Sequence, residues 1–439
     1  MLRSMYSGIS GLKNFQTKLD VIGNNIANVN TYGFKKSRVT FKDMISQQIQ
    51  GASSPQVNRG GTNPKQVGLG SQVATIDQIH TQGSLQTTGR SLDLGISGDG
   101  FFIVNDGQLS YYTRAGNFYL DSNGYLVNAD GLYVQGYAAD AAGVIDYSQL
   151  SRLRIAAGSI IAPSATTNIT FKGNLYANTE IADATNGRLF TDGATLDAKK
   201  LKEGLKSGAS LTMKVVDSLG NRHDLQIVLQ KISSTEWQAG YLLPANNDQY
   251  TFQSLGNITF NTKGEVEENT DASFTINLQP QQLTPGYTGN AQPLNITVDF
   301  GNVTQYGSLS TIDVDTINGN TEGFLEGFNV SSAGEIFGVY SNGQVQLLGQ
   351  IALANFNNPE GLTKVGENLY QVSNNSGVPN VGIAGQDMGT INGGTLEMSN
   401  VDLSEEFTEM IVAQRGFQAN TRIITTSDEI LQELVNLKR

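Results

Sequence analysis

The chain has few of the residue types that carry chemistry in other proteins. Its 439 residues include no cysteine, two histidines and one tryptophan. Without cysteine there is no disulfide, no thiolate nucleophile and no thiolate metal ligand. His80 and His223 lie in different segments, so a metal site or a Ser-His-Asp triad would have to be built across the fold. We therefore expect two surface or core histidines, no catalytic group, no metal and no cofactor.

Positive charge is also scarce. Lysine and arginine number 28 against 40 acidic residues, which gives a formal net charge of -12. A nucleic-acid partner is excluded because binding phosphates requires a concentrated basic surface, and only Lys35, Lys36, Arg38 and Lys42 form a small cluster. Residues 1–30 hold neither an apolar run that could span a bilayer nor a signal-peptide pattern. We expect no membrane insertion and, if the chain is exported, a route without a cleaved signal peptide.

The first segment has the period of an amphipathic helix. Apolar residues recur there at spacings of three and four, namely Leu2, Met5, Ile9, Leu12, Phe15, Leu19, Ile22, Ile26 and Val29. Asn14, Lys18, Asn25 and Asn28 are predicted on the opposite side. The pattern predicts one helix of about 25 residues, roughly 38 Å long.

The last segment has the same period. Asp402 and Glu405 form a capping-box pair. Alternating steps of four and three then connect Leu403, Phe407, Met410, Gln414, Phe417, Thr421, Ile424, Asp428, Leu431 and Val435. One heptad position is repeatedly polar, which weakens a coiled coil but specifies its register and partners. Because such helices are marginal alone, periodicity leaves two roles open: packing on a β body, or assembly.

Between these helices the composition favours strands. The chain has 50 glycines and nine prolines, and many threonine, valine and tyrosine residues stand between the glycines. Residues 43–90 are polar and predict an extended or irregular connector. From Leu92 onward, turn residues at Asp106-Gly107, Asn123-Gly124 and Asp130-Gly131 predict a run of β-hairpins.

A second β region covers roughly residues 165–290 and is predicted to be an insertion. The hairpin at 211–231 and Trp237 mark its core, and its ends are richer in Pro, Thr and Gln. The predicted fold class is mainly β with terminal α-helices: a multidomain chain whose discontinuous β domains are nested between coiled-coil-forming helices.

Two motifs resemble functional sites without meeting their requirements. The run DVDTING at 313–319 resembles a calcium loop, but Ile317 stands at position five and glycine at seven instead of six. Asp93, Asp99 and Asp121 lie in glycine-rich turns, where aspartate is favoured for its hydrogen bonds to the backbone. A secreted β-rich hydrolase is therefore the less favoured competing class.

Three motifs resemble one known family. They are SGISGLKNFQTKLDVIGNNIANVNTYGFKKSRVTF near the start, SLDLGISGDGFFIV followed by YTRAGNFYLDSNGYLVNADGLYVQGY in the body, and GTLEMSNVDLSEEFTEMIVAQRGFQANTRIITTSDEILQELVNL at the end. These runs are similar to the signatures of the bacterial flagellar rod and hook axial proteins, in the same order. Rod members lack a large middle insertion and hook members carry one. The chain therefore resembles the hook members, and a distal rod or other axial protein is the alternative.

The resemblance implies four regions. They are residues 1–30 with 400–439 as a terminal helical domain, 31–70 as an extended connector, 71–147 with 291–399 as an inner β domain, and 148–290 as an inserted outer β domain. It implies no enzymatic activity. The expected function is that of a structural subunit which polymerises into a flexible tubular universal joint, transmitting motor torque from rod to filament.

The resemblance also implies partners and a location. Expected partners are other copies in a helical homopolymer, the distal rod protein, the hook cap protein, the hook–filament junction protein and the flagellar type III export apparatus. The expected location is extracellular, in the hook and basal body of the bacterial flagellum.

Four asparagines, Asn24, Asn25, Asn28 and Asn30, stand where the first helix ends, although asparagine competes with the helix for backbone hydrogen bonds. We interpret this as a helix that stays disordered during export and becomes ordered when neighbouring subunits bury its stripe. The residues predicted at this polymerisation interface are Leu2, Met5, Ile9, Leu12, Leu19, Ile22, Asn24, Asn25, Ile26, Asn28, Phe407, Met410, Gln414, Phe417, Thr421, Ile424 and Leu431.

Overall fold

The structure is a computed structural model. It describes the whole chain except residues 1, 56–58, 141, 157, 184–187, 246–248, 268–271, 387 and 437–439, and it leaves out the side chains of residues 2, 3 and 434. The chain divides into two compact units. Unit 1 comprises Met1–Ala157, Gly327–Gly338 and Val345–Arg439, and unit 2 comprises Gly158–Glu326 and Val339–Gln344.

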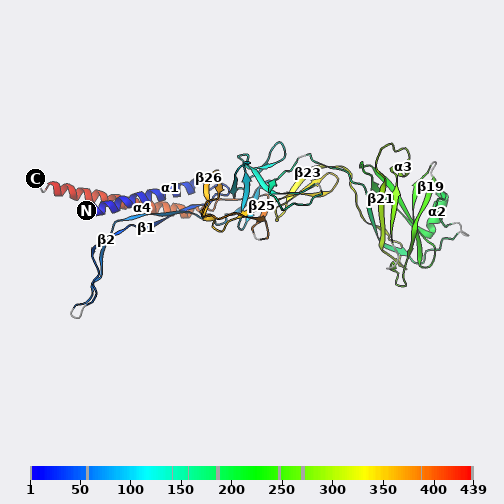
Figure 1. Cartoon of the computed structure of the whole chain (residues 1–439), viewed down its shortest axis with the longest axis horizontal. Helices are drawn as coiled ribbons and strands as arrows, with labels where there is room; N and C mark the ends of the chain where they lie inside the picture. Colours follow the sequence, from blue (N-terminus) through cyan, green and yellow to red (C-terminus); the bar gives the residue numbers. More distant parts are fainter. Residues whose placement is uncertain are drawn as a thin grey trace. The chain divides into compact units, whose positions relative to one another are not determined.

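Two long helices form one end of unit 1. Helix α1 (Leu2–Ala27) and helix α4 (Leu403–Asn436) lie side by side (Figure 1), so both predicted helices are confirmed. They are antiparallel, because Gly8 lies beside Ile424 whereas Lys18 pairs with Glu409. Among the described residues, no helix is both long and apolar enough to cross a membrane.

A two-stranded ribbon follows α1. Its strands are β1 (Ser37–Asp43), β2 (Ser46–Gln50), β3 (Lys65–Gly68) and β4 (Ser71–Gln78). Strand β1 pairs with β4 from Ser37↔Gln78 onward, and β2 pairs with β3. The predicted connector is thus extended, but it folds back on residues 71–78, which we had expected in the inner β domain. Every residue of β2 and β3 is exposed.

The rest of unit 1 is built around one mixed set of strands, in the order β23-β24-β25-β11-β7-β8-β27-β26. Its core includes Phe101, Ile103, Tyr112 and Phe356. The elements are β5 (Leu85–Thr87), β6 (Leu94–Ser97), β7 (Phe101–Asn105), β8 (Ser110–Thr113), β9 (Tyr119–Leu120), β10 (Leu126–Val127), β11 (Tyr133–Ala138), β12 (Ser151–Arg152), β23 (Gly323–Val330), β24 (Glu335–Tyr340), β25 (Val345–Asn355), η2 (Pro359–Gly361), β26 (Thr363–Gly366), β27 (Leu369–Gln371), β28 (Asn380–Ile383), β29 (Thr390–Gly393) and β30 (Thr395–Glu397).

Unit 2 contains two sheets, in the orders β20-β21-β14-β22 and β15-β19-β18-β17-β16. Their buried residues form one core that includes the predicted Trp237. The structure therefore confirms a mainly β chain with terminal helices. The elements are β13 (Ile160–Ile161), β14 (Asn168–Tyr176), β15 (Thr195–Asp197), α2 (Ala198–Gly204), η1 (Leu205–Ser207), β16 (Gly208–Val216), β17 (Arg222–Lys231), β18 (Glu236–Pro244), β19 (Gln249–Thr259), β20 (Ser273–Leu278), α3 (Pro280–Leu283), β21 (Leu294–Tyr306) and β22 (Asp313–Ile317).

The predicted bounds of the insertion need correction at both ends. Residues 291–326 belong to unit 2, because β21 pairs in parallel with β14 and supplies Phe300 to the core. At the other end the unit begins near 158 rather than 148, since Ser151 and Arg152 pair with β11 of unit 1.

Replacing Phe171 with alanine tests the shared core of unit 2. The Phe171 ring is stacked on Phe300 at 4.8 Å between centroids. We expect Phe171→Ala to lower the free energy of unfolding of unit 2 by about 3–5 kcal/mol, because it removes buried surface and leaves a cavity. Urea unfolding followed by the fluorescence of Trp237, the chain's one tryptophan, measures it. Phe324→Ala, at a side chain that is 49% exposed, should change it by less than about 0.5 kcal/mol; equal effects would contradict the shared core.

Candidate polymerisation interface

Small residues let α1 and α4 approach closely. A Cβ atom on Gly416 would lie 2.5 Å from the Phe15 ring, and one on Gly11 would lie 2.9 Å from the Asn420 side chain. Glycine inside a helix costs about 0.5–1 kcal/mol relative to alanine. Here that cost is offset by the packing of Phe15 directly against the backbone of α4.

The face of α4 that meets α1, called the seam here, is shifted by one residue from part of the prediction. Its buried or half-buried residues are Glu406, Met410, Ala413, Asn420, Ile424, Ser427 and Leu431. Met410, Ile424 and Leu431 were predicted there. Phe407, Gln414 and Thr421 are exposed instead, so placing them in a seam within one chain was wrong. As members of an interface between chains they stay a prediction.

The seam side of α1 follows the predicted stripe more closely. Ile22 is buried, whereas Ile9 is 40% exposed. The predicted residues that are half-buried are Met5, Leu12, Leu19 and Ile26. Phe417, on α4, is 37% exposed. Leu2 is the first residue of α1, but its side chain lies outside the described part of the chain.

The asparagines of α1 bind neighbouring segments rather than facing solvent. Asn25 is 1% exposed; its Nδ2 donates to the Ser37 carbonyl at 2.9 Å, and its Oδ1 accepts from the Ser37 N–H at 3.0 Å. Asn14 is also buried, and its Nδ2 donates to Ser71 Oγ at 2.8 Å. The predicted opposite polar side is therefore wrong for both, because α1 packs against β1 and β4 as well as α4.

Two of the remaining asparagines shape the end of α1. Asn28 Nδ2 donates to the carbonyl of Asn24 at 2.9 Å, and Asn28 Oδ1 accepts from Thr31 Oγ1 at 3.1 Å. Side-chain bonds of this kind satisfy backbone groups where a helix stops. The asparagines thus direct the chain from α1 into β1.

A buried ionic cluster holds the two ends of unit 1 together. Lys35 Nζ lies 2.7 Å from Glu397 Oε1 and donates to the Thr81 carbonyl at 2.8 Å. Arg114 Nη1 lies 3.4 Å from the other oxygen of Glu397. Burial lowers the pKa of Lys35, while the charge of Glu397 acts in the opposite direction. Removing one partner from such a cluster leaves an uncompensated buried charge, so these three residues fix segments from distant parts of the sequence.

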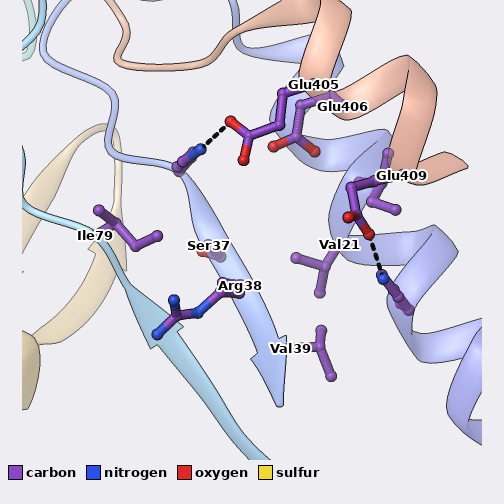
Figure 2. Close-up of a pocket in the computed structure, with 11 residues that line it drawn as sticks. Val21, Ser37, Arg38, Val39, Ile79, Glu405, Glu406 and Glu409 are labelled. Carbon is purple, nitrogen blue, oxygen red and sulfur yellow. Dashed lines mark hydrogen bonds and ion pairs between the residues drawn. The ribbon is translucent and has the colours of Figure 1, made fainter.

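A pocket of about 250 Å³ lies between α1, β1 and the first turns of α4 (Figure 2). Glu405, Glu406 and Glu409 line one side of it, and we call it the acidic pocket. Glu405 pairs with Lys36 at 2.7 Å, and Glu409 pairs with Lys18. The Glu405 carboxylate therefore does not complete the predicted capping box, although Asp402 Oδ1 accepts from the Ser404 N–H at 2.8 Å.

Glu406 differs from its two neighbours in the acidic pocket. Its side chain is buried, and Asn25 Nδ2 donates to its Oε2 at 3.2 Å. Burial raises the pKa of Glu406, and the hydrogen bond from Asn25 opposes this. Val21, Ile22, Val39 and Ile79 add an apolar wall to the same pocket.

The histidines lie inside the fold. His80 packs edge-on against Phe101 and Tyr370, and burial, aided by the charges of Lys35 and Arg114, lowers its pKa to about 4. His223 is buried; Nδ1 lies 2.8 Å from Thr284 Oγ1 and Nε2 lies 3.1 Å from Asp217 Oδ2.

Asp217 also accepts from Tyr287 at 2.7 Å and from the N–H groups of Leu219 and Asn221. Hydrogen bonds from Tyr287, Asn221 and His223 lower the pKa of Asp217, although burial acts in the opposite direction. The arrangement joins the turn between β16 and β17 to the loop after α3.

Comparison with known proteins matches four segments of the chain. They are the flagella basal body rod protein model at 5–35, the flagellar hook protein FlgE/F/G D1 domain at 95–175, the flagellar basal body protein FlaE D2 domain at 184–320 and the flagellar basal body rod FlgEFG protein C-terminal model at 392–437. The D2 match extends to 320, in agreement with the corrected end of unit 2.

Full-length relatives decide the family. The flagellar hook proteins FlgE of Borreliella burgdorferi and Treponema pallidum are 42% and 39% identical, each over 100% of both chains. The chain belongs to the flagellar hook protein family. The flagellar basal-body rod protein FlgG of Bacillus subtilis is 37% identical over 100% of both chains. A structure of the Helicobacter pylori hook protein FlgE2 has a TM-score of 0.53 at 16% identity, covering 71% of this chain and 100% of that one, and supports the fold.

As a member of the hook protein family, the chain is a structural subunit of the bacterial flagellar hook, in the flagellum. The expected family and function are therefore confirmed, and the rod alternative is not favoured.

Glu406→Gln tests the electrostatics of the acidic pocket. Because the folded-state pKa of Glu406 lies above its ordinary value of 4.5, this carboxyl group favours the folded state at low pH, and that contribution is lost as pH rises through the folded-state pKa. We expect Glu406→Gln to raise the midpoint of thermal loss of helical circular dichroism at pH 7.5, with a smaller gain at pH 4.5. Glu405→Gln, which removes an exposed ion pair, should give no gain. The same gain at both pH values would contradict the account.

Proposed function

We propose that the chain polymerises through its terminal helices and that the surface of α4 outside the seam is the principal contact between subunits. The observation that carries this proposal is a set of large apolar side chains on α4, each between 37% and 67% exposed. They are Leu403, Phe407, Ile411, Val412, Phe417, Ile423, Ile430 and Val435.

Their number and placement favour burial by other copies. A stable monomer rarely leaves a large contiguous apolar surface in water, and burial of such surface contributes about 25 cal/mol per Å². Helix α1 covers only the seam, so much of α4 lacks an apolar neighbour in the single chain. Copies packed around α4 would supply one, and the ordering of both helices would be coupled to assembly.

The ribbon of β1 to β4 supplies a second candidate contact. Ile45 and Ile49 are 83% and 61% exposed, and all of β2 and β3 is exposed. Two paired strands with apolar side chains in water are marginal alone and present edges that pair readily with another chain. We assign this ribbon to contacts with neighbouring subunits.

The remaining functions rest on membership of the hook family. The chain would form a tubular universal joint that bends while transmitting torque, with a structural and not a catalytic role. Its partners would be the distal rod, hook cap and hook–filament junction proteins and the flagellar export apparatus, and export would occur without a cleaved signal peptide. Unit 2 has its own closed core, so it can shift against neighbouring copies while the helices hold the polymer together.

Ile411→Asp tests the proposed contact surface. Ile411 is 58% exposed in the single chain, so the charge is solvated in the monomer and becomes costly only when a neighbour buries it. We expect the monomer to keep its circular dichroism and thermal midpoint, while sedimentation and electron microscopy show no tubes at concentrations where the unmodified chain forms them. Leu309→Asp, at a side chain of unit 2 that is 77% exposed, is the matched control. Normal tubes from Ile411→Asp would contradict the assignment.

A further inference from the structure

Helix α4 carries opposite charges on opposite faces. Its first turns hold Glu405, Glu406 and Glu409, preceded by the capping residue Asp402, and its middle holds Arg415 and Arg422. At about 100° per residue, Asp402 and Glu409 lie within about 40° of the direction of Ala413, which is 0% exposed in the seam. Arg415 and Arg422 lie about 200° and 180° from it, on the outer face.

The two arginines are available for another chain. Both are exposed, and the described part of the chain offers neither guanidinium group a hydrogen bond or an ion pair. Glu409 is 46% exposed although it pairs with Lys18. Asp402 is exposed and accepts hydrogen bonds only from the start of its own helix among the described residues. The monomer thus has an outer basic face and an acidic rim along the groove between α1 and α4.

We propose that neighbouring copies pack with their α4 helices parallel and displaced by 13 residues, which places Arg415 and Arg422 of one copy beside Asp402 and Glu409 of the next. This inference rests on the proposed function and adds the register of the contact. At 1.5 Å per residue the axial displacement is about 20 Å. It is the one displacement that gives both arginines an acidic partner on the pocket side, because both pairs share the spacing of 13 and each charge pair repeats after seven residues.

The facing directions agree with this register. A step of 13 residues turns the helix by about 220° beyond complete turns, so residues i and i+13 lie on nearly opposite faces. Parallel copies in a heterologous contact present different faces to each other, which requires this relation.

The acidic pocket suits the second helix. Arg422 of the neighbouring copy would lay its aliphatic stem against the apolar wall at Val21 and Ile79 and direct its guanidinium group to Glu409, as long cationic side chains do at mixed surfaces. Figure 2 shows Glu409 on the same rim as Glu405 and Glu406, beside these apolar residues.

A charge-exchange series in the full chain tests the register. Arg422→Glu places like charges side by side, and we expect the critical concentration for assembly below about 0.05 M salt to rise about tenfold. The pair Lys18→Glu with Glu409→Lys keeps the ion pair within the chain but sets the introduced lysine against Arg422 of the neighbouring copy, and the same rise is expected. Combining all three changes restores every pair and should return the critical concentration to within about twofold of the unmodified chain.

The series contains its own controls. The triple variant and Arg422→Glu have the same net charge, so recovery in the triple variant cannot come from net charge. Differences between variants should shrink at about 1 M salt, where the Debye length is about 3 Å. If the triple variant stays as defective as Arg422→Glu, or if either partial variant assembles normally, the register is overturned while the polymer stands. If the unmodified chain forms no polymer at all, the proposed function itself fails.

Discussion

The structure depends on the incomplete burial of α4. Helix α1 covers one narrow face of it, where Ala413 and Gly416 allow close approach. The remaining faces carry exposed residues such as Ile411 and Val412. An isolated helix is marginal in water and gains most of its stability from burying a face. A chain that buries one face of α4 and leaves the others apolar is therefore suited to assembly, and its helices are the part of the molecule with most to gain from neighbours.

Where α4 meets the β structure, the chain is held by polar contacts instead. Glu397 is buried with Lys35 and Arg114 just before α4 begins, and Asn25 of α1 binds both Ser37 and Glu406. Such groups are expensive to bury unless they are paired, and they then favour one arrangement over others. The polar contacts fix where the helices start from the body, and the apolar surface of α4 remains for contacts with other copies.

Part of this architecture follows from the sequence because it is local. The periods of three and four predict both helices, and the turn residues after Leu92 predict the hairpins. The pairing of β14 with β21 was missed, because it joins residues as remote as Asn168 and Thr297 and no local pattern records a parallel partner. That omission placed the end of the insertion at 290.

The candidate site was predicted in part for the same reason. Apolar residues lie on several faces of α4, so its period alone did not separate the seam from the outer surface, and Phe407 was assigned to the wrong one. Asn14 and Asn25 were predicted on a solvent face because asparagine is usually exposed. They are buried because the backbone and side chains of β1 and β4 provide their hydrogen bonds. The buried cluster at Glu397 left no local signal, since its partners come from distant segments.

The most direct test of the central claim is amide hydrogen exchange across α4, measured on the monomer and on the assembled polymer under the same buffer and temperature. Incomplete burial predicts rapid exchange over residues 403–436 in the monomer and exchange slowed by at least about a hundredfold in the polymer, while the core strands of unit 2 change little. Full protection of α4 already in the monomer, or no change on assembly, would contradict it.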